Sequence, residues 1–223
     1  MKGQKVTVRK KLSEELEDLK SLMMEMSALA TASVEKAVKS LARQDVNLAN
    51  KVIKEDDKID ELELEIENKC MHLIALQQPM AKDLRVIGSC LKIITDLERI
   101  GDRAADIAQI TKKLAGRPLI KPLVDIPRMA ELAISMIKDS VKAFKEENSL
   151  LAWGLGERDD EVDKLAQQVN RELLSFVVED PKKTSDAFLL MFVASFLERI
   201  ADHATNIAER VIYMERGERV KIN

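Results

Sequence analysis

Two fourteen-residue segments of this chain, one hundred residues apart, are nearly the same. Residues 96–109 read DLERIGDRAADIAQ, and residues 196–209 read FLERIADHATNIAE. A second match lies upstream of each copy, where the acidic stretch 56–60 corresponds to 159–163. Two motif pairs in the same order indicate that the chain consists of two copies of one structural unit.

Apolar residues recur with the period of an α-helix along most of the chain. Only 7 Gly and 5 Pro interrupt 223 residues. The pattern predicts an all-α protein with three antiparallel helices in each of two tandem repeats. The six predicted helices cover about 13–43, 46–78, 84–116, 126–146, 149–178 and 184–215, and Asp45 is a candidate N-cap for the second.

The stretch AGRPLIKPLVDIP, residues 115–127, holds one Gly and three Pro. Residues of this kind end helices, so we expect the connection between the repeats here. The predicted boundary gives a first three-helix repeat over 1–117 and a second over 118–223.

The charge balance is 36 basic against 39 acidic residues, and aromatic residues make up 3%. This argues against a nucleic-acid-binding protein, which needs a basic surface and often stacking aromatics. No apolar run approaches the ~20 residues of a membrane span, and no secretory signal is present. Cys70 and Cys90 form no CxxC motif, so we expect free thiols and a cytoplasmic protein.

Four acidic pairs have the spacing D/E-x-x-x-D, which puts both carboxylates of a pair on one helix face. They are Asp56 with Asp60, Glu98 with Asp102, Asp159 with Asp163, and Glu198 with Asp202. In each repeat, the two pairs are about equally far from the turn between the second and third helices. Antiparallel helices rise at the same rate, so the two pairs are expected at the same level.

Each pair also adjoins a predicted core residue, which places it where helices meet. Oxygen-rich clusters of this kind suit hard cations such as Mg²⁺, Ca²⁺, Mn²⁺ or ferric iron, as one or several ions. The candidate metal ligands are Asp56, Asp57, Asp60, Glu98, Asp102 and Asp106 in the first repeat, and Asp159, Asp160, Asp163, Glu198, Asp202 and Asn206 in the second. The competing interpretation is that the pairs are solvated charges neutralised by neighbouring Lys and Arg.

Other chemistry has weaker support. His72 and His203 are the only histidines, and neither has Glu three residues before it, so the Glu-x-x-His motif of di-iron bundles is absent. No phosphate loop or nucleophile motif is visible, and no catalytic residue is predicted. Gly101 has Ala201 as its counterpart, which indicates a role in close helix packing.

LERIGDRAADIA, LERIADHATNIAE and the acidic segments DDKID and DDEVD together resemble the PhoU family of phosphate-signalling regulators over about residues 13–214. The resemblance implies a twice-repeated three-helix bundle with metal-binding E(D)xxxD motifs. In some members these hold multinuclear iron clusters, and in others different ions, so iron is expected while zinc, manganese, magnesium and calcium stay open. His203 and Asn206 replace Arg103 and Asp106, so the two halves are expected to differ in metal number or identity.

The resemblance also implies a cytoplasmic negative regulator of phosphate uptake and phosphate-starvation signalling. Its implied partners are the phosphate ABC transporter and a sensor histidine kinase at the cytoplasmic membrane face, and a homodimer is expected. The sequence leaves two alternatives open: a carboxylate-metal hydrolase or oxidase in a helical bundle, and a helical adaptor without metal. The scarcity of His and the lack of a nucleophile weigh against an enzyme.

Overall fold

The computed structural model describes the backbone of residues 2–222 and the side chains of residues 10–222. Over that range the chain is helical and contains no strand. The elements are α1 (Lys2–Arg43), α2 (Val46–Glu55), α3 (Asp57–Gln77), α4 (Lys82–Leu114), α5 (Asp125–Glu146), α6 (Ser149–Trp153), α7 (Gly156–Glu179), the short 3₁₀ helix η1 (Pro181–Lys183) and α8 (Thr184–Arg216).

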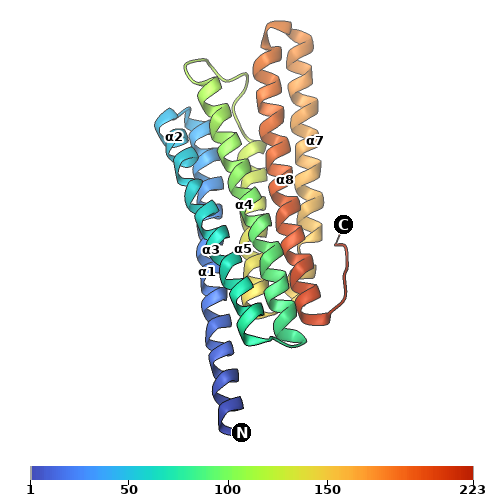
Figure 1. Cartoon of the computed structure of the whole chain (residues 1–223). Helices are drawn as coiled ribbons and strands as arrows, with labels where there is room; N and C mark the ends of the chain where they lie inside the picture. The colour runs from blue at the N-terminus through green and yellow to red at the C-terminus, as the bar shows by residue number, and fades with distance from the viewer. Residues whose placement is uncertain (1, 223) are drawn as a thin grey trace.

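The elements form the six predicted helical rods, two of which are interrupted (Figure 1). Asp56 alone separates α2 from α3, and it keeps right-handed helical angles, so the rod bends there without a loop. Gly154 and Leu155 separate α6 from α7. The first rod begins at Lys2, earlier than the residue 13 predicted from the apolar pattern. The N-cap prediction is confirmed, because Asp45 Oδ1 accepts a hydrogen bond from the Leu48 N–H at 2.9 Å.

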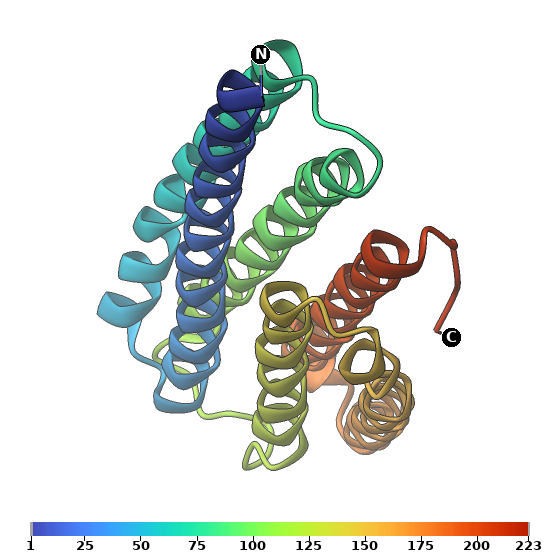
Figure 2. The same cartoon turned by 90° about the horizontal axis from the view of Figure 1, so that it is seen from below.

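Each repeat is a bundle of three antiparallel rods. Seen from below, α1, α3 and α4 group together beside the group of α5, α7 and α8 (Figure 2). The predicted linker runs from the end of α4 at Leu114 to the start of α5 at Asp125.

The apolar stripes of the rods meet in one continuous core. Most apolar residues that recur at helical spacing on α1 and α4 are buried, among them Leu19, Met26 and Leu97. Leu16, Leu22 and Leu91 are partly buried. Leu84 is 46% exposed, because it lies in the first turn of α4 at the end of the bundle. The cysteines Cys70 and Cys90 are buried free thiols.

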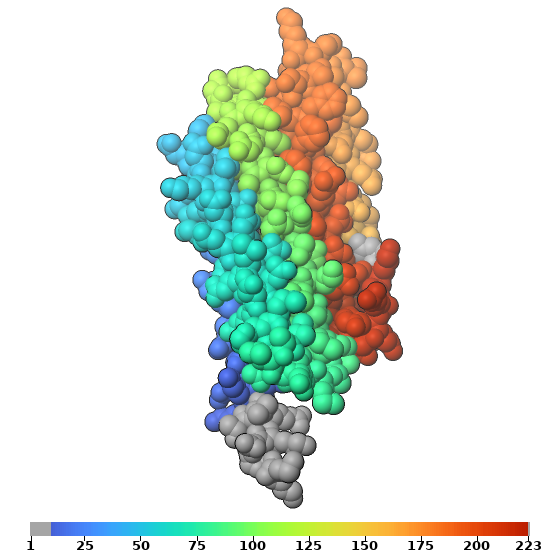
Figure 3. All heavy atoms as spheres, viewed as in Figure 1, coloured from blue at the N-terminus to red at the C-terminus, as the bar shows by residue number. Residues whose placement is uncertain are grey.

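The two repeats join chiefly through α4 and α8, which lie side by side on the face shown in Figure 3. The helices run antiparallel. Arg85 Nε near the start of α4 donates to the Met214 carbonyl near the end of α8 at 3.2 Å, and Arg117, just after α4, contacts Asp186 in the first turn of α8 at 2.7 Å. On the other side of the same seam, α1 packs against α5. Among the described residues, no helix is both long and apolar enough to cross a membrane.

Candidate metal centre

The first acidic cluster forms where the α2–α3 rod bends against α4. Asp56 occupies the bend, and its carbonyl accepts hydrogen bonds from the N–H groups of Ile59 at 2.7 Å and Asp60 at 3.3 Å. The backbone therefore enters α3 directly after Asp56. Asp57 and Asp60 lie in the first turn of α3, where the positive end of the helix dipole favours acidic groups.

Gly101 of α4 lets this bend approach closely. A methyl group on Gly101 would lie 2.8 Å from Asp56 Oδ1 and 2.8 Å from Ile59 Cδ1, both shorter than ordinary contacts. The absence of a side chain therefore seats Asp56 directly on α4, beside the turn that carries Glu98 and Asp102. The predicted packing role of Gly101 is confirmed.

The carboxylates of the two rods are close enough to repel one another. Burial, followed by the charges of Asp60, Asp102 and Glu98, raises the pKa of Asp56 to about 7. Burial and the Asp102 charge also raise the pKa of Asp60 and of Glu98. The structure thus brings Asp56, Asp60, Glu98 and Asp102 together, as their common level predicted.

The second cluster repeats this arrangement between α7 and α8. Burial and the charge of Asp163 raise the pKa of Asp202, and the same two causes, together with Asp202, raise the pKa of Glu198. Asp159 is only 2% exposed, and its Oδ1 accepts a hydrogen bond from the Thr205 hydroxyl at 3.2 Å. Asp159 is therefore more buried than Asp56, the corresponding carboxylate of the first cluster.

Arginines partly neutralise the first cluster. Arg99 lies 2.9 Å from Asp102 Oδ2 through Nη1 and 3.3 Å from Glu98 Oε2 through Nε. These ion pairs match the solvated-charge interpretation in part. They do not cancel the repulsion, because the pKa of Glu98 stays raised with Arg99 beside it.

The outer candidates separate into two groups. Asp57 adds to the raised pKa of Asp56, and Asp160 adds to the raised pKa of Asp163, so both border a cluster. Asp106 instead pairs with Arg103 at 2.6 Å.

The side chain of Asn206 also turns away from its cluster. Its amide donates to Asp96 Oδ1 on α4 at 3.3 Å, so Asn206 belongs to the seam between the repeats. His203 Nδ1 lies 2.9 Å from the same Asp96 oxygen.

The sequence patterns missed three polar residues here. Glu63 adds to the raised pKa of Glu98 and accepts a hydrogen bond from Thr95, but its counterpart in the second repeat is Ala166, so the duplication gave no signal. Thr205 and Asp96 have no matching partner in the other repeat either. All three lie within four residues of a motif carboxylate, which is the only signal they carry.

The two clusters share one level along the seam. Asp96 of α4 lies opposite His203 of α8, and Arg103 lies opposite Phe196, with the guanidinium 5.5 Å from the ring centroid. The residues between these contacts on α4, 97–102, therefore lie beside 197–202 of α8. Glu98 and Asp102 stand at the height of Glu198 and Asp202.

The donor set fits a hard cation, because it consists of carboxylates that repel one another at a helix junction. Among residues 10–222, however, no three His, Cys, Asp or Glu side chains are set around one point as a ready metal site. Binding an ion would require carboxylate rotamers to turn inward and Arg99 to release Glu98 and Asp102.

The chain is similar to known proteins over almost its whole length. The family model described as "PhoU domain" matches residues 23–111 and, a second time, residues 126–211. A phosphate-specific transport system accessory protein PhoU homolog of Aquifex aeolicus is 47% identical over 211 residues, covering 95% of this chain and 96% of the relative. The same-named protein of Clostridium acetobutylicum is 42% identical, covering 96% and 99%.

Solved structures agree with these relatives. The crystal structure of PhoU from Pseudomonas aeruginosa matches with a TM-score of 0.88 at 36% identity, covering 92% of this chain and 99% of that one. PhoU from Streptococcus pneumoniae, described as a phosphate transport system regulatory protein, matches with a TM-score of 0.88 at 29% identity, covering 94% and 99%. The chain, with both of its repeats, belongs to the PhoU family.

Proposed function

We propose that this protein is an accessory regulator of phosphate uptake. The observation that carries the proposal is similarity over almost the whole length to relatives named as accessory proteins of the phosphate-specific transport system. These relatives are named for an accessory role. A binding protein that acts on the transport machinery accounts for these features better than an enzyme.

The finer parts of the proposal follow the family resemblance. The protein acts as a negative regulator at the cytoplasmic face of the membrane. It contacts the phosphate ABC transporter and a sensor histidine kinase, and so connects phosphate supply to the phosphate-starvation response. A homodimer remains a prediction from the sequence.

The two acidic clusters form the metal-binding part of the proposal. Asp56, Asp60, Glu98 and Asp102 would hold an ion in the first repeat, with Asp57 at the edge. Asp159, Asp163, Glu198 and Asp202 would do so in the second, with Asp160 at the edge. The raised pKa values support this, since the cost of crowding these carboxylates falls when a cation lies among them. A hard ion such as iron or magnesium, or several ions, suits the oxygen donors.

A bound ion would supply positive charge that ties the α2–α3 rod to α4, and the α7 rod to α8. Its role would be to stiffen the two bundles and to set the charge of their acidic faces. The chain itself holds the carboxylates in place through the bend at Asp56 and the close contact at Gly101. In the second repeat, the Thr205 hydroxyl orients Asp159.

Metal binding is tested by removing one cluster at a time. Glu98→Ala with Asp102→Ala should remove the metal of the first repeat and leave that of the second, while Glu198→Ala with Asp202→Ala should do the reverse. Element-resolved X-ray fluorescence of protein purified without chelator measures both. Glu65→Ala with Glu67→Ala is the matched control, because it removes two exposed charges from α3 outside the cluster. Unchanged metal content in either cluster variant would show that the ligands are wrongly assigned.

The regulatory role is tested in cells that lack their own copy of the protein. Phosphate uptake in phosphate-rich medium should be unrestrained in such cells, and expression of this chain should lower it. Uptake that is the same with and without the chain would refute the accessory role, whatever the metal analysis gives.

A further inference from the structure

A long groove runs between α1 and α5, on the opposite side of the seam from α4 and α8. It consists of two adjoining hollows, of about 590 and 480 Å³, which share Glu35 and Lys138 in their linings. The lining extends along α1 from Met24 to Ala42. At about 1.5 Å per residue, this stretch is about 27 Å long, which is room for about five turns of a helix.

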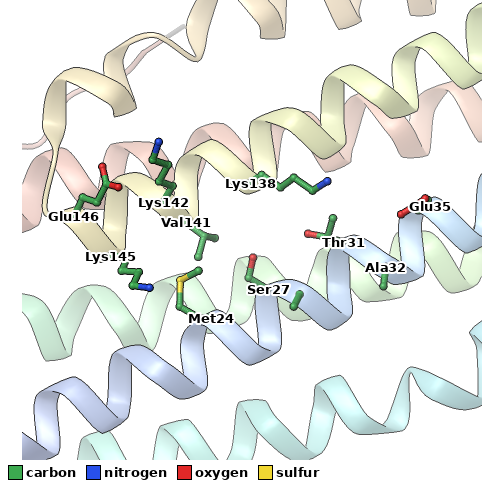
Figure 4. A pocket seen from close by; sticks show the side chains of 11 residues that line it. Met24, Ser27, Thr31, Ala32, Glu35, Lys138, Val141, Lys142, Lys145 and Glu146 are labelled. Carbon is green, nitrogen blue, oxygen red and sulfur yellow. The ribbon is translucent and has the colours of Figure 1, made fainter.

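Small side chains form the α1 wall of this groove. Ser27, Thr31 and Ala32 succeed one another there, as Figure 4 shows. Ala28 also lines the hollow. Val141 of α5 adds an apolar surface opposite them. Because helices pack about 8–10 Å apart depending on the side chains between them, a wall of small residues lets another helix lie close.

The α5 wall carries a row of unneutralised positive charge. Lys138, Lys142 and Lys145 are exposed, recur at helical spacing on α5 and all line the hollow. In Figure 4, Lys145 points toward Met24 of α1, whereas Lys142 lies on the other side of the α5 ribbon. Within the described part of the chain, none of the three makes an ion pair or a side-chain hydrogen bond. The nearby Asp139 is held by Arg158 at 2.8 Å and is not available to them.

Two lysines of α1 show the contrast, because each is paired with an acidic residue outside α1. Lys36 on α1 contacts Glu55 at 2.6 Å, and Lys20 contacts Glu147 at 3.1 Å. Opposite the lysine row, Glu35 is the acidic residue common to both hollows. The groove thus has small side chains along α1. Its α5 wall carries the three lysines together with Glu131 and Glu146, and its α1 wall carries Glu35 and Lys39.

We propose that the α1–α5 groove binds an amphipathic helix of a partner protein, with its acidic side chains against Lys138, Lys142 and Lys145. The inference deepens the proposed accessory function and rests on it, since it assigns a surface to a protein partner. An acidic row at helical spacing on the partner would meet the lysines, and its apolar residues would cover the small side chains of α1. No groove residue belongs to either acidic cluster, so binding here leaves the metal ligands free.

The probe is a fluorescent peptide of about 20 residues, long enough to fill the groove as a helix. It carries Leu and Ala on one face and Glu at i, i+4 and i+7 beside them. A second peptide has Lys in place of each Glu. Anisotropy titrations should show that the acidic peptide binds and the basic one does not, with weaker binding as salt is raised.

The decisive variant is Lys138→Glu with Lys142→Glu and Lys145→Glu. It should weaken binding of the acidic peptide by at least ~10-fold, because close charge pairs turn repulsive. The matched control is Lys54→Glu with Lys92→Glu and Lys112→Glu, which makes the same charge change at exposed sites outside the groove and should bind as the unaltered protein does. Ala32→Trp tests the α1 wall by filling the space above it and should weaken binding with no change of charge.

Three results would overturn the proposal. They are a failure of the unaltered protein to bind the acidic peptide, equal binding of both peptides, and equal loss in the lysine variant and its control. Binding to phosphatidylglycerol vesicles in the absence of peptide binding would also overturn it, since the lysines would then face a membrane.

A cell assay separates this inference from the accessory function. If the lysine variant retains its metal but no longer lowers phosphate uptake, the groove is the partner surface. If it lowers uptake normally, the groove proposal fails while the accessory function stands. If the unaltered chain does not lower uptake either, the accessory function fails, and the peptide titrations alone decide whether the groove binds acidic helices.

Discussion

Asp56→Asn should stabilise the metal-free protein near neutral pH while weakening its metal site. In the folded chain, the pKa of Asp56 is raised to about 7, whereas an unfolded aspartate releases its proton near pH ~4. The folded state therefore binds more protons between these values, so stability falls as the pH rises from about 4 to about 7. Above about pH 7, Asp56 is charged in the folded state, and its burial and the repulsion from neighbouring carboxylates destabilise the fold in full. Asparagine is uncharged and removes this destabilisation.

The magnitude follows from the size of the shift. Roughly three pKa units correspond to about 4 kcal/mol. Asp56 keeps partial access to solvent, which screens its neighbours, so we expect a gain of only about 1–2 kcal/mol at pH ~8. For a chain of this length, this raises Tm by about 2–8 °C.

The measurement is urea unfolding of chelator-treated protein at pH ~8 and at pH ~4.5. The gain in stability from Asp56→Asn should be present at pH ~8 and small at pH ~4.5. At the lower pH, Asp56 in the folded protein is protonated and therefore as neutral as asparagine. Asp57→Asn is the control, because it removes the same charge from an exposed neighbour and should change stability by less than ~0.5 kcal/mol. An Asp56→Asn protein that is no more stable at pH ~8, or equally stabilised at both pH values, would refute the crowding argument.

Two further predictions concern the packing around the clusters. Gly101→Ala should change stability by less than ~1 kcal/mol, because the helix propensity gained offsets the displaced side chains, yet it should reduce metal content in the first repeat by moving Asp56. Elemental analysis with urea unfolding checks this, and full metal occupancy would contradict it. Asp96→Ala should cost about 1–2 kcal/mol in urea unfolding, since it leaves the facing groups of His203 and Asn206 without their acceptor. A cost below ~0.3 kcal/mol would show that solvent replaces Asp96 freely.

The helical pattern and the duplication predicted the fold well, because both depend on local periodicity that the sequence displays directly. Six rods, two bundles and the common level of the acidic pairs follow from apolar spacing and from the distance of each pair to its turn. The bend at Asp56 was not predicted, since this residue keeps helical angles and no Gly or Pro marks the position. Residues 2–12 lie in α1 although the apolar stripe that served as the guide begins later.

The site was less predictable at its edges than at its centre. Duplication displays the four central carboxylates of each repeat twice and so singled them out, and their role as metal ligands stays a prediction. Asp106 and Asn206 satisfied the same pattern, but their side chains pair with Arg103 and Asp96. Which face of α4 or α8 meets the other repeat depends on packing between distant segments, and no spacing within one helix contains that information.

The crossing of α4 and α8 has a consequence for how this protein can change. Within one chain, the duplicated helices still meet in the way that two identical subunits would, so position 96 faces 203 while position 196 faces 103. In a pair of identical subunits, these two contacts would be made by the same two residue types. Here the contact at Asp96 is a polar network with His203 and Asn206, and the contact at Phe196 is an arginine against an aromatic ring. Fusion of the two units therefore frees each end of the seam to evolve its own chemistry.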